Sequence, residues 1–350
     1  MNIAFLIPDL AQGGAQKQCI KLAKALETYC NFKITLITFR NTGEQEYLLD
    51  SWFVNRFNLG NSSGFNPKLI WDVRKTLIDQ DIDILVTWLH SADVIGYFAT
   101  LNLKCKWILN ERDSQYPVKL RYLFRRIVGL FANLILANST KGLEYWSYTF
   151  GNIQKQRVYN IVDVNQQYCK NPKMIDIIYV GRLEKQKNFL KVIGVMKEIA
   201  RLRSDINLII VGNGSLFEPG RRAAIREISE GTIHFLGYRN DAEELISNSR
   251  MLINLSSHEG SPNTVLEALV LNTIPILSYI PEHVELVGQE YPLLFALNDP
   301  VDKIAKVVLE KLPEYNPQKI SIDTASLVSR NRPEVAAKDF LKICSNLMGV

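Results

Sequence analysis

The sequence predicts an α/β protein of two domains, each built on a doubly wound parallel sheet with helices on both faces. Two observations lead to this prediction. Apolar runs of strand length alternate with segments of helical period along the whole chain, which is the pattern of parallel sheets. The chain is also 350 residues long, which is more than one core of ordinary size needs.

The first half of the chain has five expected strands and one especially clear helix. The helix follows the Gly13-Gly14 pair, because its apolar residues repeat at helical spacing while its lysines lie off that stripe. The expected strands are Asn2–Ile7, Lys33–Phe39, Ile84–Trp88, Trp107–Leu109 and Leu134–Ala137.

The second half repeats this alternation after a polar break. The expected strands there are Asp176–Val180, Leu208–Val211, Ile233–Leu236, Met251–Leu255 and Ile274–Leu277. Residues 166–173 are polar and contain Asn171-Pro172, which predicts a linker. The first domain therefore takes residues 1–165 and the second takes 174–332. Residues 333–350 should form a helix that crosses back to the first domain.

Composition points to a globular protein of the cytoplasm. The chain is 47% hydrophobic and 22% charged, and its five cysteines are odd in number and lack a Cys-x-x-Cys pairing. We therefore expect reduced thiols and no zinc site. No basic region precedes Ile3–Ile7, so this run should be a strand and not a signal peptide. The longest apolar segment, Ile127–Ala137, is broken by Asn133 and is too short to span a membrane.

Two glutamates are the most informative residues of the chain. Glu259 is expected in a polar loop after Met251–Leu255, and Glu267 in the first turn of a helix. N–H groups that lack partners at a helix N-terminus favour bound phosphate. One carboxylate can therefore accept hydrogen bonds from hydroxyl groups while nearby backbone amides bind an anion. This combination suits a nucleotide sugar, which carries hydroxyl groups on either side of a diphosphate.

Three sequence blocks together resemble the retaining, GT4-type glycosyltransferases of the group 1 family. They are the Ser-x-x-Glu-Gly-x-Pro-x-x-x-x-Glu-Ala block that begins at Ser256, the stretch from Tyr179 to Asn188, and the stretch from Asp9 to Gln16. They occur in the family's order and span nearly the whole chain. The resemblance implies the GT-B fold, in which two Rossmann-like domains face each other across a cleft. It assigns the acceptor to the first domain and the nucleotide sugar to the second.

The resemblance also implies catalytic roles for four residues. Arg182 and Lys187 would meet the negative charge that builds on the departing phosphate, and removing such a contact typically costs about 3 kcal/mol. Lys185 matches nothing in the motif and is expected to be an ordinary surface charge. Glu259 would face the sugar or its phosphate, and His90 would donate to a hydroxyl of the transferred sugar. For His90, a helix-capping or core role is the alternative.

The remaining expected contacts are with the bound substrates. The first glycines would line the cleft, and an arginine after Leu109 would bind the acceptor. Glu267 would bind the ribose, and the helix start beside it would hold phosphate. Two later turns would receive the base. These residues are Gly13, Gly14, Glu267, Asn263, Thr264, Val265, Gly212, Gly237, Tyr238 and Arg112. Ordinary turns and surface salt bridges are the alternatives for the glycines and for Arg112.

No cluster of His, Asp or Glu in the sequence has the spacing of metal ligands, and no Asp-x-Asp is available for a cation bound to the diphosphate. We therefore expect no metal and no cofactor other than the donor. Retention of the anomeric configuration suggests a carboxylate nucleophile. For this family the usual proposal is instead a front-side route, in which the departing phosphate helps to take the acceptor's proton. The sequence does not decide between them.

The segment Val118–Phe131 carries a separate signal. Six apolar residues fall on one arc of a helix, with Arg121 and Arg125 on one margin and Lys119 and Arg126 on the other. A helix that lies in a membrane interface has this pattern. A helix packed in the core, with basic residues that reach out to solvent, has the same pattern.

The sequence leads to a retaining transferase that moves a hexose or N-acetylhexosamine from a nucleotide diphosphate sugar, most simply a UDP-sugar, to a glycan acceptor. The expected setting is bacterial surface polysaccharide synthesis, such as O-antigen, lipopolysaccharide or capsule, on an undecaprenyl-diphosphate carrier. The protein would act in the cytoplasm, with peripheral contact to the inner membrane. A nucleotide-sugar epimerase of the same fold and a noncatalytic sugar-binding protein are the alternatives. The family's Gly-Gly is missing after Ile274–Leu277, where the chain reads Ser278-Tyr279-Ile280-Pro281-Glu282, so the donor sugar stays open.

Overall fold

The computed structural model describes residues 1–11, 13–40, 43, 45, 49, 52, 55–60, 66–113, 116, 118–147, 153–163, 172–226, 232–313 and 324–349. The chain divides into two compact units. Unit 1 comprises Met1–Asp163 and Ser329–Val350, and unit 2 comprises Val164–Val328. Most of the expected linker, residues 166–171, lies outside the described residues.

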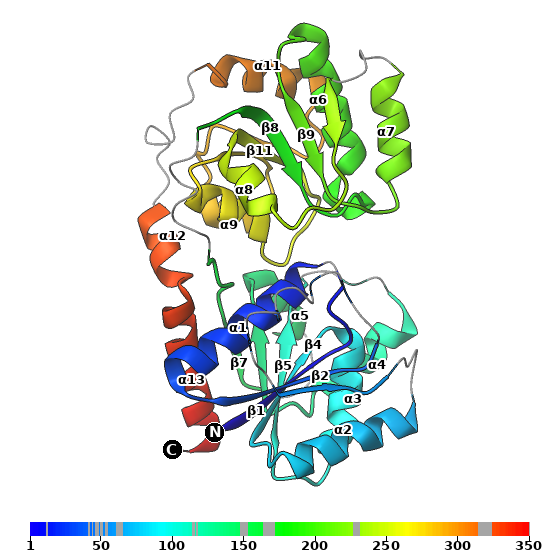
Figure 1. Ribbon diagram of the computed structural model, residues 1–350, viewed down its shortest axis with the longest axis vertical. Helices are drawn as coiled ribbons and strands as arrows, with labels where there is room; N and C mark the ends of the chain where they lie inside the picture. Colours follow the sequence, from blue (N-terminus) through cyan, green and yellow to red (C-terminus); the bar gives the residue numbers. More distant parts are fainter. Residues whose placement is uncertain are drawn as a thin grey trace. The chain divides into compact units, whose positions relative to one another are not determined.

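Unit 1 is built on a parallel sheet with strand order β3-β2-β1-β4-β5-β6-β7 (Figure 1). Its strands are β1 (Asn2–Ile7), β2 (Lys33–Thr38), β3 (Asn55–Asn58), β4 (Ile84–Trp88), β5 (Lys106–Glu111), β6 (Leu134–Ala137) and β7 (Lys155–Arg157). Its helices are α1 (Gly14–Cys30), α2 (Pro67–Asp79), α3 (His90–Thr100), α4 (Leu120–Gly129), α5 (Thr140–Ser147) and α13 (Pro333–Met348). The helix α12 (Thr324–Arg330) precedes α13.

Successive residues of β1 enter two different cores, one on each face of the sheet. Ile3, Phe5 and Ile7 pack with residues of α1 and α13, whereas Ala4 and Leu6 pack with residues of α2 and α3. Side chains alternate between the faces of a strand, so a strand buried on both faces reads as one continuous apolar run. The C-terminal helix α13 lies beside α1 (Figure 1) and completes the first of these cores.

Unit 2 contains a second parallel sheet, with strand order β10-β9-β8-β11-β12-β13. Its strands are β8 (Ile175–Val180), β9 (Leu208–Val211), β10 (Ile233–Phe235), β11 (Ser249–Asn254), β12 (Ile274–Ser278) and β13 (Leu294–Phe295). Its helices are α6 (Phe189–Leu202), α7 (Phe217–Ile225), α8 (Ala242–Ser247), α9 (Asn263–Val270), α10 (Pro281–Val287) and α11 (Val301–Lys311), with a short 3-10 helix, η3, at Lys185–Lys187.

The predicted α/β class, with two parallel sheets, is confirmed, and all ten expected strands are present within a few residues of their predicted bounds. Three short strands were missed, namely β3, β7 and β13, and each lies at the edge of its sheet. The sequences of β3 and β7 read Asn-Arg-Phe-Asn and Lys-Gln-Arg. Polar residues protect an exposed sheet edge from pairing with another chain, so these strands lack the apolar signal of buried ones.

Both sheets reverse their strand order at one point, between β1 and β4 in unit 1 and between β8 and β11 in unit 2. Parallel α/β sheets bind ligands beyond the carboxyl ends of the strands at such a reversal. The loops after these four strands are therefore where a site is expected. Across the described residues, the structure contains no helix with the length and apolar character needed to cross a membrane.

Candidate functional site

In unit 2 the strand reversal brings Lys187 and Glu259 into direct contact. Lys187 ends η3 after β8, and Glu259 lies in the loop after β11. The Lys187 ammonium donates to both carboxylate oxygens of Glu259, at 2.6 and 2.7 Å. Two of the predicted catalytic residues thus form one ion pair, although they are 72 positions apart in the sequence.

The Glu259 carboxylate is buried and surrounded by hydrogen-bond donors. It is 4% exposed, and its Oε1 accepts from the Ser256 hydroxyl at 2.7 Å and from the Asn254 amide at 3.4 Å. Burial by itself would raise the pKa of Glu259, but Lys187 and these polar neighbours hold that pKa below its usual value. Glu259 is therefore a fixed negative charge at neutral pH, held in one orientation.

Gln186 joins the two loops that carry the ion pair. Its side-chain amide donates to the His258 carbonyl at 3.1 Å, and its own carbonyl accepts from the Ser257 N–H at 2.9 Å. Arg182 is exposed, and its guanidinium donates to the Gln186 side-chain oxygen at 3.2 Å. The predicted Arg182, Lys187 and Glu259 therefore belong to one connected group. Sequence reasoning missed Gln186 as the connector, although the motif had included it.

The turns after β8 and β9 are packed too tightly for side chains at Gly212. A Cβ there would lie 1.9 Å from the Gly181 carbonyl oxygen, and the φ of Gly212 is +135°. The Gly212 N–H donates to the Gly237 carbonyl at 2.7 Å. This hydrogen bond holds the turn after β10 against the turn after β9. Tyr238 follows Gly237 and is half-buried. These glycines let the backbones meet and so fix the Arg182 loop.

Helix α9 begins at Asn263, so Glu267 lies in its second turn and not in the first turn, where the sequence analysis had placed it. Its side chain is buried, at 5% exposure. The N-cap residue is Pro262, which makes no side-chain cap, and its carbonyl accepts from the Val265 N–H at 3.1 Å. A helix start without a side-chain cap is suited to an anion. Asn263 and Thr264 form that start.

In unit 1, His90 is the first residue of α3, directly after β4. Its Nε2 lies 3.2 Å from the Arg121 carbonyl, and its ring meets the edge of Tyr122 at 5.1 Å between centroids. A carbonyl only accepts hydrogen bonds, so Nε2 carries the proton and Nδ1 is an acceptor in the neutral ring. Burial, together with nearby arginines, lowers the pKa of His90 and favours this neutral form. His90 would thus accept from a hydroxyl, where the sequence analysis expected it to donate.

The other predicted residues of unit 1 follow the neighbouring strands. Gly13 is the N-cap of α1 after β1 and has an extended backbone, so its conformation does not demand glycine. Gly14 is the first residue of α1. Arg112 follows β5, and its guanidinium lies 4.8 Å from the Trp88 ring and donates to the Asn160 side-chain oxygen at 2.5 Å. The loops of Gly13, His90 and Arg112 are adjacent because β1, β4 and β5 are adjacent.

Unit 1 also holds a buried ion triad that the sequence analysis did not anticipate. Arg125 of α4 donates to Asp93 at 2.7 Å and to Glu111 at 2.8 Å, and all three side chains are at most 1% exposed. Glu111 also accepts from the Trp146 indole at 2.9 Å and from the Arg112 backbone N–H at 2.9 Å. In the sequence, Arg125 resembles the other cations of its segment, so nothing there distinguishes it.

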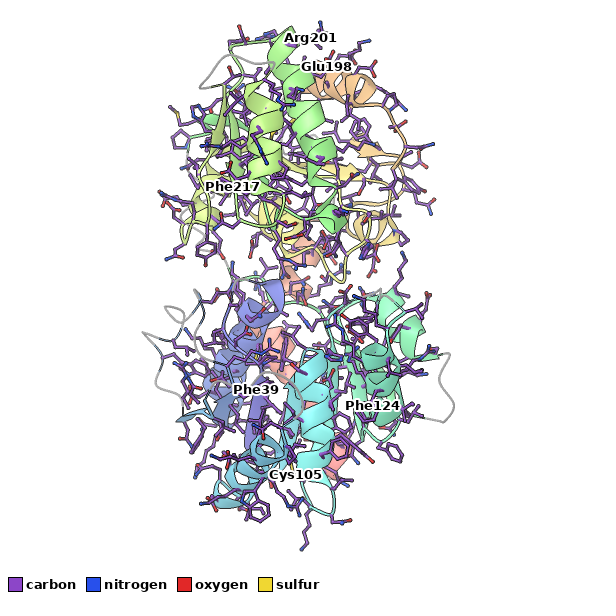
Figure 2. The ribbon with its side chains drawn as sticks, turned by 90° about the vertical axis from the view of Figure 1, so that its right-hand side faces the viewer. Phe39, Cys105, Phe124, Glu198, Arg201 and Phe217 are labelled. Atoms are coloured by element: carbon purple, nitrogen blue, oxygen red, sulfur yellow. The ribbon has the colours of Figure 1, made fainter. Side chains whose placement is uncertain are left out.

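The triad orients α4 with its apolar face outward. Leu120, Leu123, Phe124, Ile127 and Phe131 are between 42% and 82% exposed, and we call them the α4 apolar face. In Figure 2, Phe124 is labelled in the right-hand half of unit 1. The core-packed alternative for this helix is therefore wrong, and so is the placement of Arg125 on the margin. A helix turns its polar side inward only when that side finds buried partners, and Arg125 has two.

Among the residues that the structure describes, no group of three or more His, Cys, Asp or Glu side chains is placed to hold a metal ion.

The chain matches known glycosyltransferases in sequence. Residues 163–320 match the family model described as glycosyl transferases group 1. Over 220 residues the chain is 27% identical to the N-acetylgalactosamine-N,N'-diacetylbacillosaminyl-diphospho-undecaprenol 4-alpha-N-acetylgalactosaminyltransferase of Campylobacter jejuni, and this match covers 58% of the chain and 59% of that protein. A second Campylobacter jejuni protein is named GalNAc-alpha-(1->4)-GalNAc-alpha-(1->3)-diNAcBac-PP-undecaprenol alpha-1,4-N-acetyl-D-galactosaminyltransferase. It is 23% identical over 300 residues, which is 79% of each chain.

Solved structures share the fold over the full length. Anabaena HepE in complex with UDP-glucose has a TM-score of 0.84 and 17% identity, and covers 99% of this chain and 100% of its own. TarM of Staphylococcus aureus, in a complex that includes UDP, has a TM-score of 0.76 at 9% identity, with complete coverage of both chains. The matched region, residues 163–320, thus belongs to the group 1 glycosyltransferases, and the chain as a whole has the GT-B fold.

Proposed function

We propose that the protein transfers a hexose or N-acetylhexosamine, with retention, from a UDP-sugar to a glycan on undecaprenyl diphosphate, in the assembly of a bacterial surface polysaccharide. The observation that carries the proposal is the connected group of Arg182, Lys187 and Glu259 at the strand reversal of unit 2. It combines cations for a diphosphate with an oriented carboxylate at the place where α/β sheets bind ligands.

The donor half of the proposal rests on charge and on similar structures. Arg182 is an exposed cation beside the Lys187–Glu259 pair, and Glu267 is a buried acid close to the start of α9. HepE has been solved with UDP-glucose and with UDP, which favours a uridine nucleotide for this chain as well. A base in the turns at Gly212 and Gly237, ribose at Glu267 and diphosphate near Arg182 is the arrangement that we propose.

In the reaction, negative charge grows on the departing phosphate as the glycosidic bond breaks. Arg182 supplies positive charge there, and a preorganised cation in a site from which water is excluded lowers the barrier. Lys187 is held in place by Glu259, so the pair presents an ammonium of fixed position with a carboxylate behind it. We propose that these protein charges and the start of α9 serve in place of a metal. In unit 1, the Nδ1 of His90 would accept from a sugar hydroxyl.

The acceptor half rests on the relatives and on α4. The names of both Campylobacter jejuni relatives specify acceptors linked to undecaprenol through a diphosphate. The α4 apolar face is exposed, and Lys119, Arg121 and Arg126 accompany it on the same short segment. Apolar side chains flanked by cations are suited to an anionic bilayer surface. We therefore propose peripheral contact with the cytoplasmic face of the inner membrane, where such an acceptor resides.

The proposal is tested by offering UDP- and GDP-sugars to the purified protein together with synthetic undecaprenyl-diphosphate acceptors that carry one or two N-acetylhexosamines. Product is separated by chromatography, and NMR coupling constants give the anomeric configuration of the new linkage. We expect transfer from at least one UDP-hexose or UDP-N-acetylhexosamine to a lipid-linked acceptor. Transfer to soluble glycans alone would refute the lipid-linked acceptor, and an inverted product would refute retention.

A further inference from the structure

A buried histidine lies at the carboxyl end of β12, and the proposed reaction does not use it. His283 is in the first turn of α10, and its side chain is 0% exposed. Among the residues that the structure describes, its Nε2 has no hydrogen-bond partner. Leaving a buried polar atom without a partner typically costs about 1–3 kcal/mol. Buried ionisable groups with shifted pKa values cluster at functional sites, and they also occur in structural ion-pair networks.

The contacts of His283 define which of its nitrogens carries the proton. Nδ1 lies 2.9 Å from the Ser278 carbonyl oxygen, which can only accept, so Nδ1 is the donor. The Ser278 hydroxyl lies 3.3 Å from the same nitrogen but gives its own hydrogen to the Ser256 carbonyl at 2.5 Å. In the neutral ring Nε2 therefore carries no hydrogen and can only accept a hydrogen bond.

Hydrogen bonds connect this ring to Glu259. The Ser278 hydroxyl holds the Ser256 carbonyl, and the Ser256 hydroxyl lies 2.7 Å from Glu259 Oε1. Glu259 in turn binds Lys187. The chain of contacts thus crosses from the end of β12 to the loop after β11 and then to η3.

Two charged groups act on the ring, Glu259 and Lys187. Burial lowers the pKa of His283, Lys187 lowers it further, and Glu259 opposes both. The net direction is downward, so the ring is neutral at neutral pH and becomes protonated only as the pH falls below the ordinary histidine value of about 6.5. A protonated ring would then compete with Lys187 for the charge of Glu259.

We propose that His283, as a neutral ring, is a positioning residue that fixes Glu259 for its partnership with Lys187 by holding Ser278. This inference rests on the proposed function, because it assigns His283 to the same donor site. Displacing a catalytic group by about 1 Å can cost on the order of a hundredfold in rate, so a residue without substrate contact can matter for kcat.

Two near-isosteric variants separate the roles of the two ring nitrogens. In His283→Asn the side-chain amide can take the place of Nδ1 and still donate to Ser278, whereas in His283→Gln the amide lies nearer the position of Nε2. We expect H283Q to lower kcat on the order of tenfold or more, with a smaller change in donor KM. H283N should keep most of the wild-type kcat. His234→Gln, in which an exposed histidine of β10 is replaced, is the matched control. Equal rates for H283Q and wild type, with both folded by circular dichroism, would overturn the inference.

The pH dependence of kcat/KM separates a positioning role of His283 from a purely structural one, because a purely structural role would not change it. A nucleotide diphosphate sugar has no phosphate group that titrates near neutrality, so we expect an acid limb of kcat/KM below pH ~6.5 to which both His283 and His90 contribute. H283N cannot titrate at this position, so its acid limb should be shallower than that of the wild type and come from His90. An unchanged limb in H283N would contradict the proposal.

The protonation state can also be measured without any substrate. Nitrogen-15 NMR of labelled histidine should show His283 as the Nδ1–H tautomer at neutral pH. The opposite tautomer, or a charged ring, would refute the inference even if no active donor had been found. Failure of the wild-type protein to transfer any sugar would instead refute the proposed function.

Discussion

The two units contain buried ion pairs near equivalent strand reversals, and the pairs differ in how far solvent reaches them. In unit 1, Arg125, Asp93 and Glu111 are all at most 1% exposed. In unit 2, Glu259 is buried but the side chain of Lys187 is 19% exposed. A charge that no ligand can reach holds the fold together, whereas a half-buried cation held by a buried carboxylate can still act on a ligand. The same chemistry thus serves architecture in one unit and, as we propose, transfer in the other.

The largest effect is expected at the triad. Arg125→Ala would leave two buried carboxylates without their cation, and breaking a buried ion pair in this way typically costs about 3–5 kcal/mol. Chemical denaturation of the full chain should show this loss. Arg126→Ala, one position along on the same helix, is the control and should change stability by about 1 kcal/mol or less, the usual worth of a cation–π contact such as the one it makes with Tyr145. Equal stability of the two variants would mean that the triad does not hold unit 1 together.

The surface cations of α4 should affect membrane binding and not folding. Lys119, Arg121 and Arg126 are expected to contribute about 1 kcal/mol each on an anionic bilayer. Neutralising all three should therefore weaken salt-sensitive binding to phosphatidylglycerol vesicles by roughly a hundredfold while the protein stays folded. Arg125 is kept in this variant, because its loss is expected to destabilise unit 1. Unchanged vesicle binding would remove α4 from the proposed interface.

In unit 2, the comparison predicts different outcomes for the two cations. Arg182 is exposed, so Arg182→Ala should lower kcat by roughly two orders of magnitude without loss of stability. Lys187→Ala should lower kcat similarly and also destabilise unit 2, since it leaves Glu259 buried without its partner.

Glu259→Gln keeps the shape of the side chain and removes its charge, so it should lose rate as well. Lys185→Ala, an exposed neighbour in η3, is the control. Near-normal donor-saturation kinetics in all three site variants, each folded by circular dichroism, would show that the site is misplaced.

The sequence was sufficient for the fold and for the main charged residues, for identifiable physical reasons. Buried parallel strands are apolar on both faces, so Asn2–Ile7 and Leu208–Val211 were predicted with their observed bounds. Arg182, Lys187 and Glu259 were found because they match the motifs of a known family, and their expected place at carboxyl strand ends agreed with that match. The fold class is confirmed by the structure, and the family match is confirmed for residues 163–320. The roles of the site residues stay predictions.

Other features depend on contacts between distant segments and could not be read from local patterns. The orientation of α4 was open because an amphipathic pattern gives two faces without saying which is buried. Only Asp93 and Glu111, distant in sequence from Arg125, decide it. His283 gave no signal for the same reason, since its meaning comes from Ser278 and from the loop of Glu259. Pairings of this kind follow from topology and not from periodicity.

A smaller effect is expected at Glu267. This acid is proposed to hold ribose hydroxyls equally in the ground state and in the transition state, so its loss should raise donor KM and leave kcat nearly unchanged. An increase of about tenfold corresponds to a lost contact of roughly 1.4 kcal/mol. Saturation kinetics of Glu267→Gln, in which the volume is kept, should show this division. A fall in kcat at constant KM would instead show that Glu267 stabilises the transition state, as is proposed for Arg182 and Lys187.

The smallest effect should come from removing divalent metal. If Arg182, Lys187 and the start of α9 supply the positive field for the diphosphate, EDTA should leave kcat unchanged, because no protein-bound metal then contributes to the barrier. Transfer is best followed by chromatography of the lipid product, since coupled assays for released UDP use enzymes that need magnesium. Complete loss in EDTA, with recovery on adding Mg²⁺ or Mn²⁺, would contradict the proposal. It would also change the comparison between the units, since the Lys187–Glu259 pair would then be structural, as the triad is, and the metal would carry the charge of the reaction.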